Sequence, residues 1–188
     1  MNSLSDNQVS LYEEPVQEKI RKFIKIEFLL NKIYYFKSKD NKSENYIALL
    51  ALCELYEILS RSDIKSELIR EIETQNSYFE KIKEIPQADS SKLNSVLEKQ
   101  NLLLKSIYNI ESNYLDYLEH DILFKTILKN CFTQLQPASI DFWLSRDILI
   151  RETQIDLWLE PLIFIKRSID FILEVIRKSG RFEDRMAE

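Results

Sequence analysis

The sequence contains few of the residues on which most non-helical folds depend. Glycine occurs once in 188 residues, as Gly180, and proline occurs four times. Tight β-hairpins and phosphate-binding loops need glycine, because only a residue without a Cβ enters positive φ freely or lets a ligand approach the backbone. This scarcity argues against a β-sandwich and against a Rossmann domain. The predicted fold class is therefore all-α, a multi-helix bundle.

The length and composition indicate one globular domain. Hydrophobic residues make up 45% of the 188 residues and charged residues 30%, which is typical of a folded chain. A chain of this length can bury a hydrophobic core without disulfides or metals. We expect residues 1–10 to form a flexible N-terminus and residues 11–188 to form a single helical domain.

The charge balance argues against nucleic acid as a partner. The chain carries 26 basic and 31 acidic residues, a net charge of −5, whereas nucleic-acid binders usually present a basic face. The N-terminal 42 residues differ, with eight basic and six acidic side chains. A basic stripe of Arg21, Lys22 and Lys25 is therefore predicted on the first helix, and Arg61 and Lys65 would extend it. It is either a solvated face or a binding site for an acidic peptide.

Cysteine use and the absence of long apolar runs point to the cytoplasm. The two cysteines, Cys53 and Cys131, both lie in apolar helical stretches, and we interpret them as buried free thiols in a reducing compartment. The N-terminus does not read as a signal peptide. The longest uncharged apolar run, Ile47–Cys53, is far shorter than the ~20 residues that span a bilayer. A soluble cytoplasmic protein without direct membrane insertion is predicted.

The sequence offers little material for an active site. Its one histidine, His120, precedes Asp121, and neither zinc-ligand spacing nor a Glu-x-x-His motif surrounds it. Glycine-rich nucleotide loops are also absent. We therefore predict a protein that is not an enzyme and that has neither a metal nor a cofactor. A small-molecule or enzymatic site around His120 and the nearby tyrosines stays open as the alternative.

Apolar residues recur at helical spacing along most of the chain. The first helix is predicted to start at Pro15, with Glu18 and Lys22 as an i,i+4 ion pair. Further helices are expected to be capped by Ser62, by Asp89 or Ser90, and by Asp121.

The last predicted helix has the most regular pattern. Its apolar residues are spaced alternately three and four apart, which is typical of helices that pack with knobs in holes. Pro161 lies near its start and Gly180 at its end. The pattern fits either a contact within one chain or a seam shared between two subunits. The residues are Ile155, Trp158, Leu162, Ile165, Ile169, Ile172 and Ile176.

Three sequence blocks carry a family resemblance. The first is LYEEPVQEKIR at Leu11–Arg21, followed by KIEFL at Lys25–Leu29. The second is ELIREI at Glu67–Ile72, followed by Ile85–Pro86. The third is Trp143–Leu144, followed by RETQID at Arg151–Asp156, Trp158 and Pro161–Leu162. With the Ile176–Arg177 end of the last helix they cover about residues 11–182 in register. In these blocks the chain resembles the ZapD family of bacterial Z-ring-associated proteins.

The resemblance implies a cytoplasmic homodimer at the division site, midcell, that binds FtsZ, the tubulin-like division GTPase. Members of the family cross-link FtsZ protofilaments into bundles and so support Z-ring assembly. The implied contact is with the short, partly acidic C-terminal tail of FtsZ. By position, Arg21 and Arg61 match basic residues of the family's binding site, and Lys25 and Lys65 are their neighbours.

Some features depart from the family pattern. In the family a β-rich half follows the helical half, and this chain ends near that junction, so we expect the C-terminal β-rich domain to be absent from it. The segment Thr133–Ile140 is shorter than in the family, and Ile122 replaces an expected basic residue. These departures leave an alternative open, a helical dimerisation module without FtsZ-tail binding.

Overall fold

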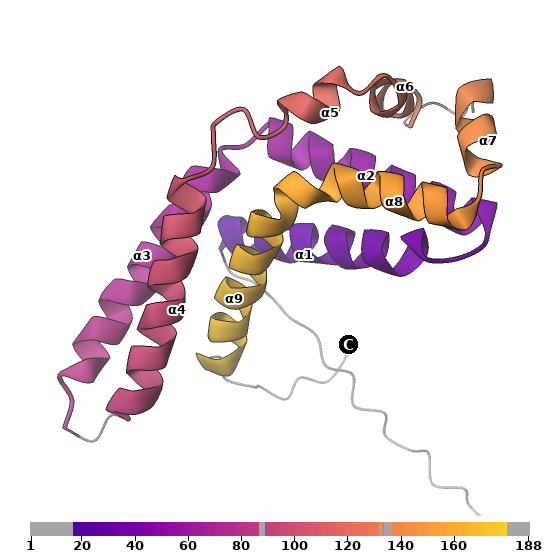
Figure 1. Ribbon diagram of the computed structural model, residues 1–188. Helices are drawn as coiled ribbons and strands as arrows, with labels where there is room; N and C mark the ends of the chain where they lie inside the picture. Colours follow the sequence, from indigo (N-terminus) through magenta and orange to yellow (C-terminus); the bar gives the residue numbers. More distant parts are fainter. Residues whose placement is uncertain (1–16, 87–88, 132, 134–136, 180–188) are drawn as a thin grey trace, which may run out of the picture.

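The computed structural model describes residues 17–86, 89–131, 133 and 137–179, and its regular structure is entirely helical (Figure 1). The predicted all-α fold is confirmed for these ranges. The expected flexible segment 1–10, the helix start at Pro15 and the helix end at Gly180 lie outside them. The helices are α1 (Glu18–Lys37), α2 (Lys42–Ser60), α3 (Ile64–Lys83), α4 (Ser90–Tyr108), α5 (Asp116–His120), α6 (Ile122–Asn130), α7 (Ala138–Leu144), α8 (Ile148–Leu159), a 3-10 turn (Glu160–Leu162) and α9 (Ile163–Ser179).

Helices α1 and α2 form an antiparallel pair joined by a short turn. Asn41 caps α2, since its side-chain oxygen accepts a hydrogen bond from the Ser43 amide at 2.8 Å. The fully buried Asn45 donates from its side chain to the carbonyl oxygens of Phe36 and Lys39, at 3.0 and 2.7 Å. Because these bonds satisfy carbonyls at the end of α1, the turn is fixed and the two helices pack along their length.

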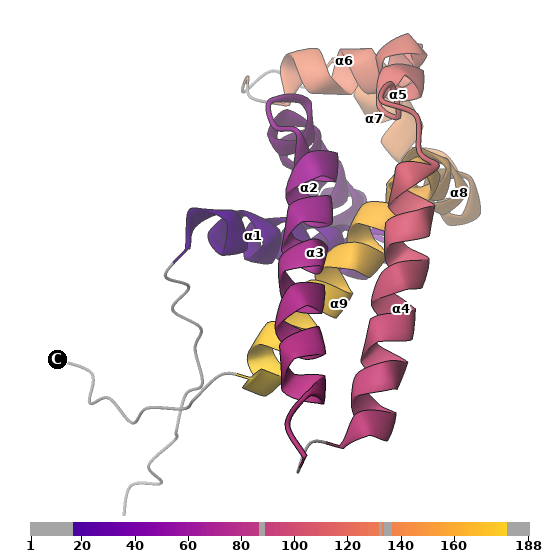
Figure 2. The ribbon, with the colours of Figure 1, turned by 90° about the vertical axis from the view of Figure 1, so that its left-hand side faces the viewer.

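Helices α3, α4 and α9 form an arm that projects from this pair (Figure 2). Asp63 caps α3, accepting from the Ser66 amide at 3.1 Å, so the predicted cap at Ser62 is wrong by one residue. Asp89 caps α4 as expected. The Ser62 hydroxyl instead donates back to the Ile58 carbonyl of α2 at 2.7 Å.

The last predicted helix is two helices, α8 and α9, joined by the 3-10 turn that contains Pro161. Proline has no N–H to donate and its ring crowds the preceding turn, so the chain bends there and α9 leaves α8 in a new direction (Figure 1). The regular apolar seam continues through the bend. Six of its seven residues are almost fully buried within this one chain, and α9 packs on α1, α3 and α4. The interpretation as a contact within the chain therefore holds in place of a seam between subunits.

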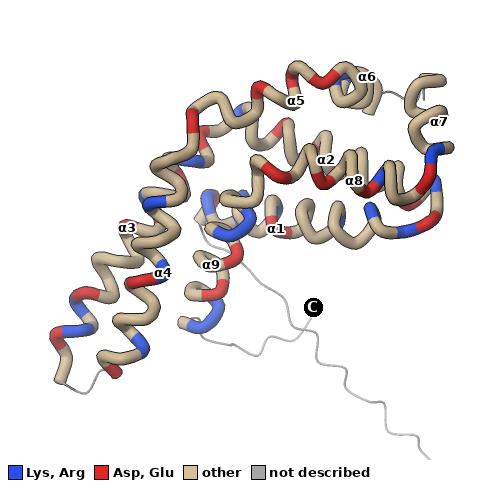
Figure 3. The backbone as a smooth tube through the Cα atoms, in the orientation of Figure 1, with Lys and Arg blue, Asp and Glu red and all other residues tan. Residues whose placement is uncertain are grey.

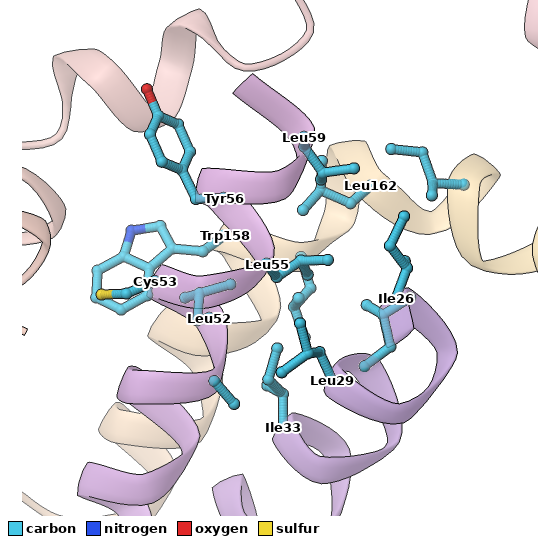
Figure 4. Close-up of a cluster of buried hydrophobic side chains, with 14 of the residues drawn as sticks. Ile26, Leu29, Ile33, Leu52, Cys53, Leu55, Tyr56, Leu59, Trp158 and Leu162 are labelled. Carbon is cyan, nitrogen blue, oxygen red and sulfur yellow. The ribbon is translucent and has the colours of Figure 1, made fainter. Parts of the chain in front are cut away.

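One apolar cluster connects the helices and contains the buried Trp158 of α8 (Figure 4). The indole of Trp158 stacks on Trp143 and meets the ring of Phe124 edge to face. Cys53 lies fully buried in this cluster, whereas Cys131 is only partly buried. Neither cysteine forms a disulfide, as predicted, but complete burial is right for Cys53 alone.

None of the described helices combines the length and apolarity that crossing a bilayer requires.

Candidate functional site

The four predicted site residues lie on or directly beside three consecutive helices. Arg21 and Lys25 are one turn apart on α1, Arg61 follows the last residue of α2, and Lys65 lies in the first turn of α3. Because α1 and α2 run antiparallel, the first turns of α1 lie toward the end of α2. We call these four residues the basic face.

Carboxylates of the same chain neutralise much of this face, and basic and acidic residues are interspersed along α1, α2 and α3 (Figure 3). Lys25 Nζ lies 2.7 Å from Oε1 of Glu54 on α2, and the Arg61 guanidinium pairs with Glu57 one turn back. Arg21 is 3.6 Å from Glu18. The cations in these three pairs are more than half exposed. Exposed ion pairs contribute only about 0–1 kcal/mol, so another carboxylate can replace the present partner at little cost.

Two further lysines of α1 point toward α3 and do not belong to the exposed face. Lys22 Nζ lies 2.6 Å from Glu67, and Lys19 Nζ lies 2.5 Å from Glu71. The predicted pair of Glu18 with Lys22 is therefore wrong. Both lysines join α1 to α3, and the lysine–carboxylate pairs are half-buried, which favours a structural role over partner binding.

A cavity of about 550 Å³ lies where α2 passes into α3 and is lined on its other side by residues 112–116 and Glu119. Arg61 and Lys65 line it, but so do Asp63, Asp116 and Glu119. Hydrogen bonds from the side chain and backbone of Ser66 hold the pKa of the Asp63 carboxyl below its usual value, so this group is ionised at neutral pH. The cavity therefore has mixed charge and is not a strongly basic pocket.

Lys65 differs from the other members of the basic face. Its ammonium group donates a hydrogen bond to the main-chain carbonyl of Ile110, across the cavity from α3. That bond holds the turn after α4 against the start of α3. The side chain is half-buried, so Lys65 has a structural task that Arg61, with its side chain 77% exposed, does not have.

The arrangement around His120 does not form an acid–base pair with Asp121. The ring Nδ1 of the exposed His120 lies 2.6 Å from the carbonyl of Asp116, within its own helix. Asp121 is already used by two other groups, the Phe124 amide at 2.8 Å and the Trp158 indole at 2.9 Å. Within the described ranges no group of three or more His, Cys, Asp or Glu side chains could hold a metal ion.

The tyrosines near His120 also have structural partners. The Tyr117 hydroxyl donates to the main-chain carbonyl of Trp158, and the Tyr56 hydroxyl donates to Glu119 at 2.7 Å. Burial raises the pKa of Tyr114 to about 12, and of Tyr56 likewise, with the bond to Glu119 as a second cause. Neutral, buried phenols of this kind are suited to packing.

The sequence reasoning did not identify the carboxylates that face the basic residues. Glu57 could have been found, because it precedes Arg61 by four residues on one helix. Glu54 could not, because its contact with Lys25 depends on the register between α1 and α2. These carboxylates set the electrostatic balance of the face.

Comparison with known proteins gives a consistent result. The pattern of the family described as "ZapD: Cell division protein" matches residues 24–188. A cell division protein ZapD from Azoarcus sp. (strain BH72) is 26% identical over 181 residues, covering 94% of this chain and 72% of the relative. A cell division protein ZapD from Nitrosomonas eutropha is 28% identical over 174 residues, covering 90% and 69%.

The matched range includes three of the four residues of the basic face. Lys25, Arg61 and Lys65 lie within residues 24–188, and Arg21 lies just before it. The family consists of cell division proteins that are not enzymes, in agreement with the prediction from composition. Because the match covers well over half of the residues, the chain belongs to the ZapD family of cell division proteins.

Proposed function

We propose that this protein binds the acidic C-terminal tail of FtsZ through its basic face and, as a homodimer, cross-links FtsZ protofilaments at the division site. Membership in the ZapD family supports this reading. The observation that carries the site is the exposure of Arg21, Lys25 and Arg61 together with the weakness of their present ion pairs.

Tail binding on this face works by exchange of carboxylates. An incoming acidic side chain replaces Glu54 or Glu57 opposite an exposed cation, so the net gain at each cation is small. Contacts of this kind steer and orient a partner more than they hold it, and they weaken as salt screens them. One such site binds weakly. In a dimer that holds one FtsZ tail of a polymer, however, the second site meets a neighbouring tail at a high effective concentration, so the overall affinity for the polymer exceeds that of either site alone.

One observation favours a second candidate function, a dimerisation module without tail binding. The cavity beside Arg61 contains three carboxylates, those of Asp63, Asp116 and Glu119, which repel an acidic tail. Under this alternative the exposed cations serve solubility and folding only. The dimer would still form, but FtsZ would not be captured.

Co-sedimentation with GTP-polymerised FtsZ at low salt separates the two candidates. FtsZ without its C-terminal tail is the control for the tail. The double variant R21E/R61E tests the site, because both side chains are exposed and their substitution leaves the core intact. K81E/K83E, at two exposed lysines in the last turn of α3 and so at the end of that helix away from the basic face, is the matched control because it changes the net charge by the same amount.

The proposal predicts that the wild-type chain and K81E/K83E pellet with FtsZ, that tail deletion abolishes pelleting, and that R21E/R61E pellets about tenfold less. Equal pelleting of R21E/R61E and K81E/K83E would reject the basic face as the site. A chain shown to be dimeric by sedimentation velocity that never pellets with FtsZ would establish the dimerisation module instead.

A further inference from the structure

A second hollow lies between α6 and α7, away from the basic face. Its volume is about 320 Å³, within the range of ligand sites. Apolar groups dominate its wall, and two of them are unusually exposed for their size, Ile122 at 84% and Phe142 at 71%. The residues that line this groove are Ile122, Leu123, Thr126, Ser139, Phe142, Trp143 and Arg146.

Two polar groups of the groove lack partners. The indole N–H of Trp143, a residue that is 97% buried, has no acceptor among the described residues. A buried donor left without an acceptor costs about 1–3 kcal/mol, which a bound acceptor would recover. The exposed guanidinium of Arg146 likewise forms no ion pair with any described residue.

The local charge selects the kind of ligand. The groove's lining has one cation, Arg146, and no carboxylate. Outside the lining, α6 adds the exposed Lys125 and Lys129 and contains no acidic residue, whereas α7 adds the exposed Asp141. This is the reverse of the cavity beside Arg61, where carboxylates outnumber cations.

We infer that the groove between α6 and α7 binds a short peptide in which a bulky apolar side chain stands next to a carboxylate. The apolar side chain enters between Ile122 and Phe142, the carboxylate meets the Arg146 guanidinium, and a peptide carbonyl accepts the Trp143 N–H. Arginine suits this role because its fork of donors fits a carboxylate at two points.

The groove's size argues against a second copy of this chain as the occupant. A stable dimer buries roughly 800 Å² on each partner, far more than seven lining residues around a small hollow provide. Across a two-fold axis the cations Arg146, Lys125 and Lys129 would also face their own copies.

This peptide site goes beyond the proposed tail site and lies at the other end of α2. Lys42, the first residue of α2, donates to the hydroxyl of Ser145 at the end of α7, at 3.1 Å, whereas Arg61 follows the last residue of α2. A helix of 19 residues is about 28 Å long. One chain therefore presents two separate surfaces to its partners.

The groove can be tested by NMR on the full chain. The two tryptophans give two indole N–H signals, and W143F assigns the signal of Trp143. The probe is acetyl-Glu-Leu-Phe-Glu-amide, with acetyl-Gln-Leu-Phe-Gln-amide and acetyl-Glu-Ala-Ala-Glu-amide as probes that lack the carboxylates or the bulky side chains. We expect the first probe to shift the Trp143 signal saturably and the two others to bind at least about tenfold more weakly.

Two variants and two controls connect the shift to the groove. R146E and F142S alter exposed residues of the groove, and each should weaken peptide binding about tenfold. K105E and L102S make the same kinds of change on the exposed surface of α4 and should leave peptide binding unchanged. An unshifted Trp143 signal, or equal affinities for R146E and K105E, would overturn the inference. A shift that grows with protein concentration without any peptide would also overturn it, by showing a second copy in the groove.

Discussion

The carboxylate of Asp121 and the indole of Trp158 are joined across 37 residues of sequence by a hydrogen bond of 2.9 Å. One carboxylate oxygen accepts the indole N–H, and the other accepts the Phe124 amide at 2.8 Å and so caps α6. A single side chain thus starts one helix and satisfies the only polar side-chain atom of a tryptophan buried in the core. The link positions α6 against α8.

Replacement of Asp121 by alanine should be more damaging than the loss of an ordinary helix cap. The loss of the cap costs about 1 kcal/mol, and the unsatisfied indole N–H of Trp158 costs a further 1–3 kcal/mol or so. Asp147→Ala is the matched control, because Asp147 caps α8 through the Leu149 amide and holds no buried group. Urea denaturation followed by far-UV circular dichroism measures both. Equal losses of stability would show that the indole bond contributes nothing.

Isoleucines 163 and 165 test whether the seam of α9 is internal. Ile165 is 1% exposed and Ile163 is 43% exposed. Ile165→Ala should lower the free energy of unfolding by about 2–5 kcal/mol, and Ile163→Ala by less than about 1 kcal/mol, because only the first leaves a cavity. The loss should not depend on protein concentration. A destabilisation by Ile165→Ala that disappears at high protein concentration would indicate a seam between subunits.

Lys65 and Arg61 should separate folding from partner binding. Arg61→Met removes an exposed ion pair with Glu57 and should change stability by no more than about 0.5 kcal/mol. Lys65→Met leaves the half-buried Ile110 carbonyl without its donor and should cost about 1–2 kcal/mol. Thermal unfolding of both variants checks this. If the two variants unfold at the same temperature, the hydrogen bond from Lys65 to Ile110 does not stabilise the fold.

Tyr56 should contribute to alkaline unfolding. Burial, assisted by its hydrogen bond to Glu119, raises the pKa of Tyr56 from 10.0 to about 12. A pKa that is higher in the folded state means that the stabilisation is complete below pH 10 and is lost as the pH rises toward 12. Tyr56→Phe should therefore make stability fall less steeply in this window, by up to about 1 kcal/mol per pH unit. Urea denaturation at several pH values gives the slope, and an unchanged slope would contradict the assignment.

The two thiols should differ sharply in reactivity. Burial, with a hydrogen bond from the Cys53 thiol to the neighbouring Cys131 as a second cause, raises the pKa of Cys53, so its reactive thiolate is scarce in the folded protein. Cys131 is partly exposed. Brief alkylation of the native protein followed by mass spectrometry should label Cys131 first and Cys53 only after denaturation. If Cys53 is alkylated in native C131S as fast as in the urea-denatured protein, burial does not protect this thiol.

Several local features could be predicted from the sequence because they depend on neighbours in the chain. Asp89 and Asp121 cap their helices as expected, since a cap needs only the following three residues. The Ser62 assignment failed because Asp63, one residue later, offers a carboxylate to the same group of amides. The last helix was predicted in one piece because its apolar spacing continues across Pro161, although the backbone bends there.

The candidate site could be predicted in part only. The family blocks and the local surplus of basic residues pointed to Arg21, Lys25, Arg61 and Lys65, and the structure leaves Arg21, Lys25 and Arg61 exposed. The structural task of Lys65 was not visible, because it depends on a carbonyl 45 residues away. The groove at Ile122 and Phe142 was not predicted either, since exposed apolar residues and core residues look alike in a sequence.

The sequence by itself determined the helical class, the family and the helix starts at Asp89 and Asp121, because these follow from glycine scarcity, motif order and local hydrogen bonding. The tertiary structure decided which charges are neutralised and which apolar residues stay uncovered. It brought Glu54 to Lys25, Asp156 to Lys37 at 2.7 Å across 119 residues, and α6 beside α7. Such relationships depend on the angles and register between helices, which arise only when all the helices pack around one core.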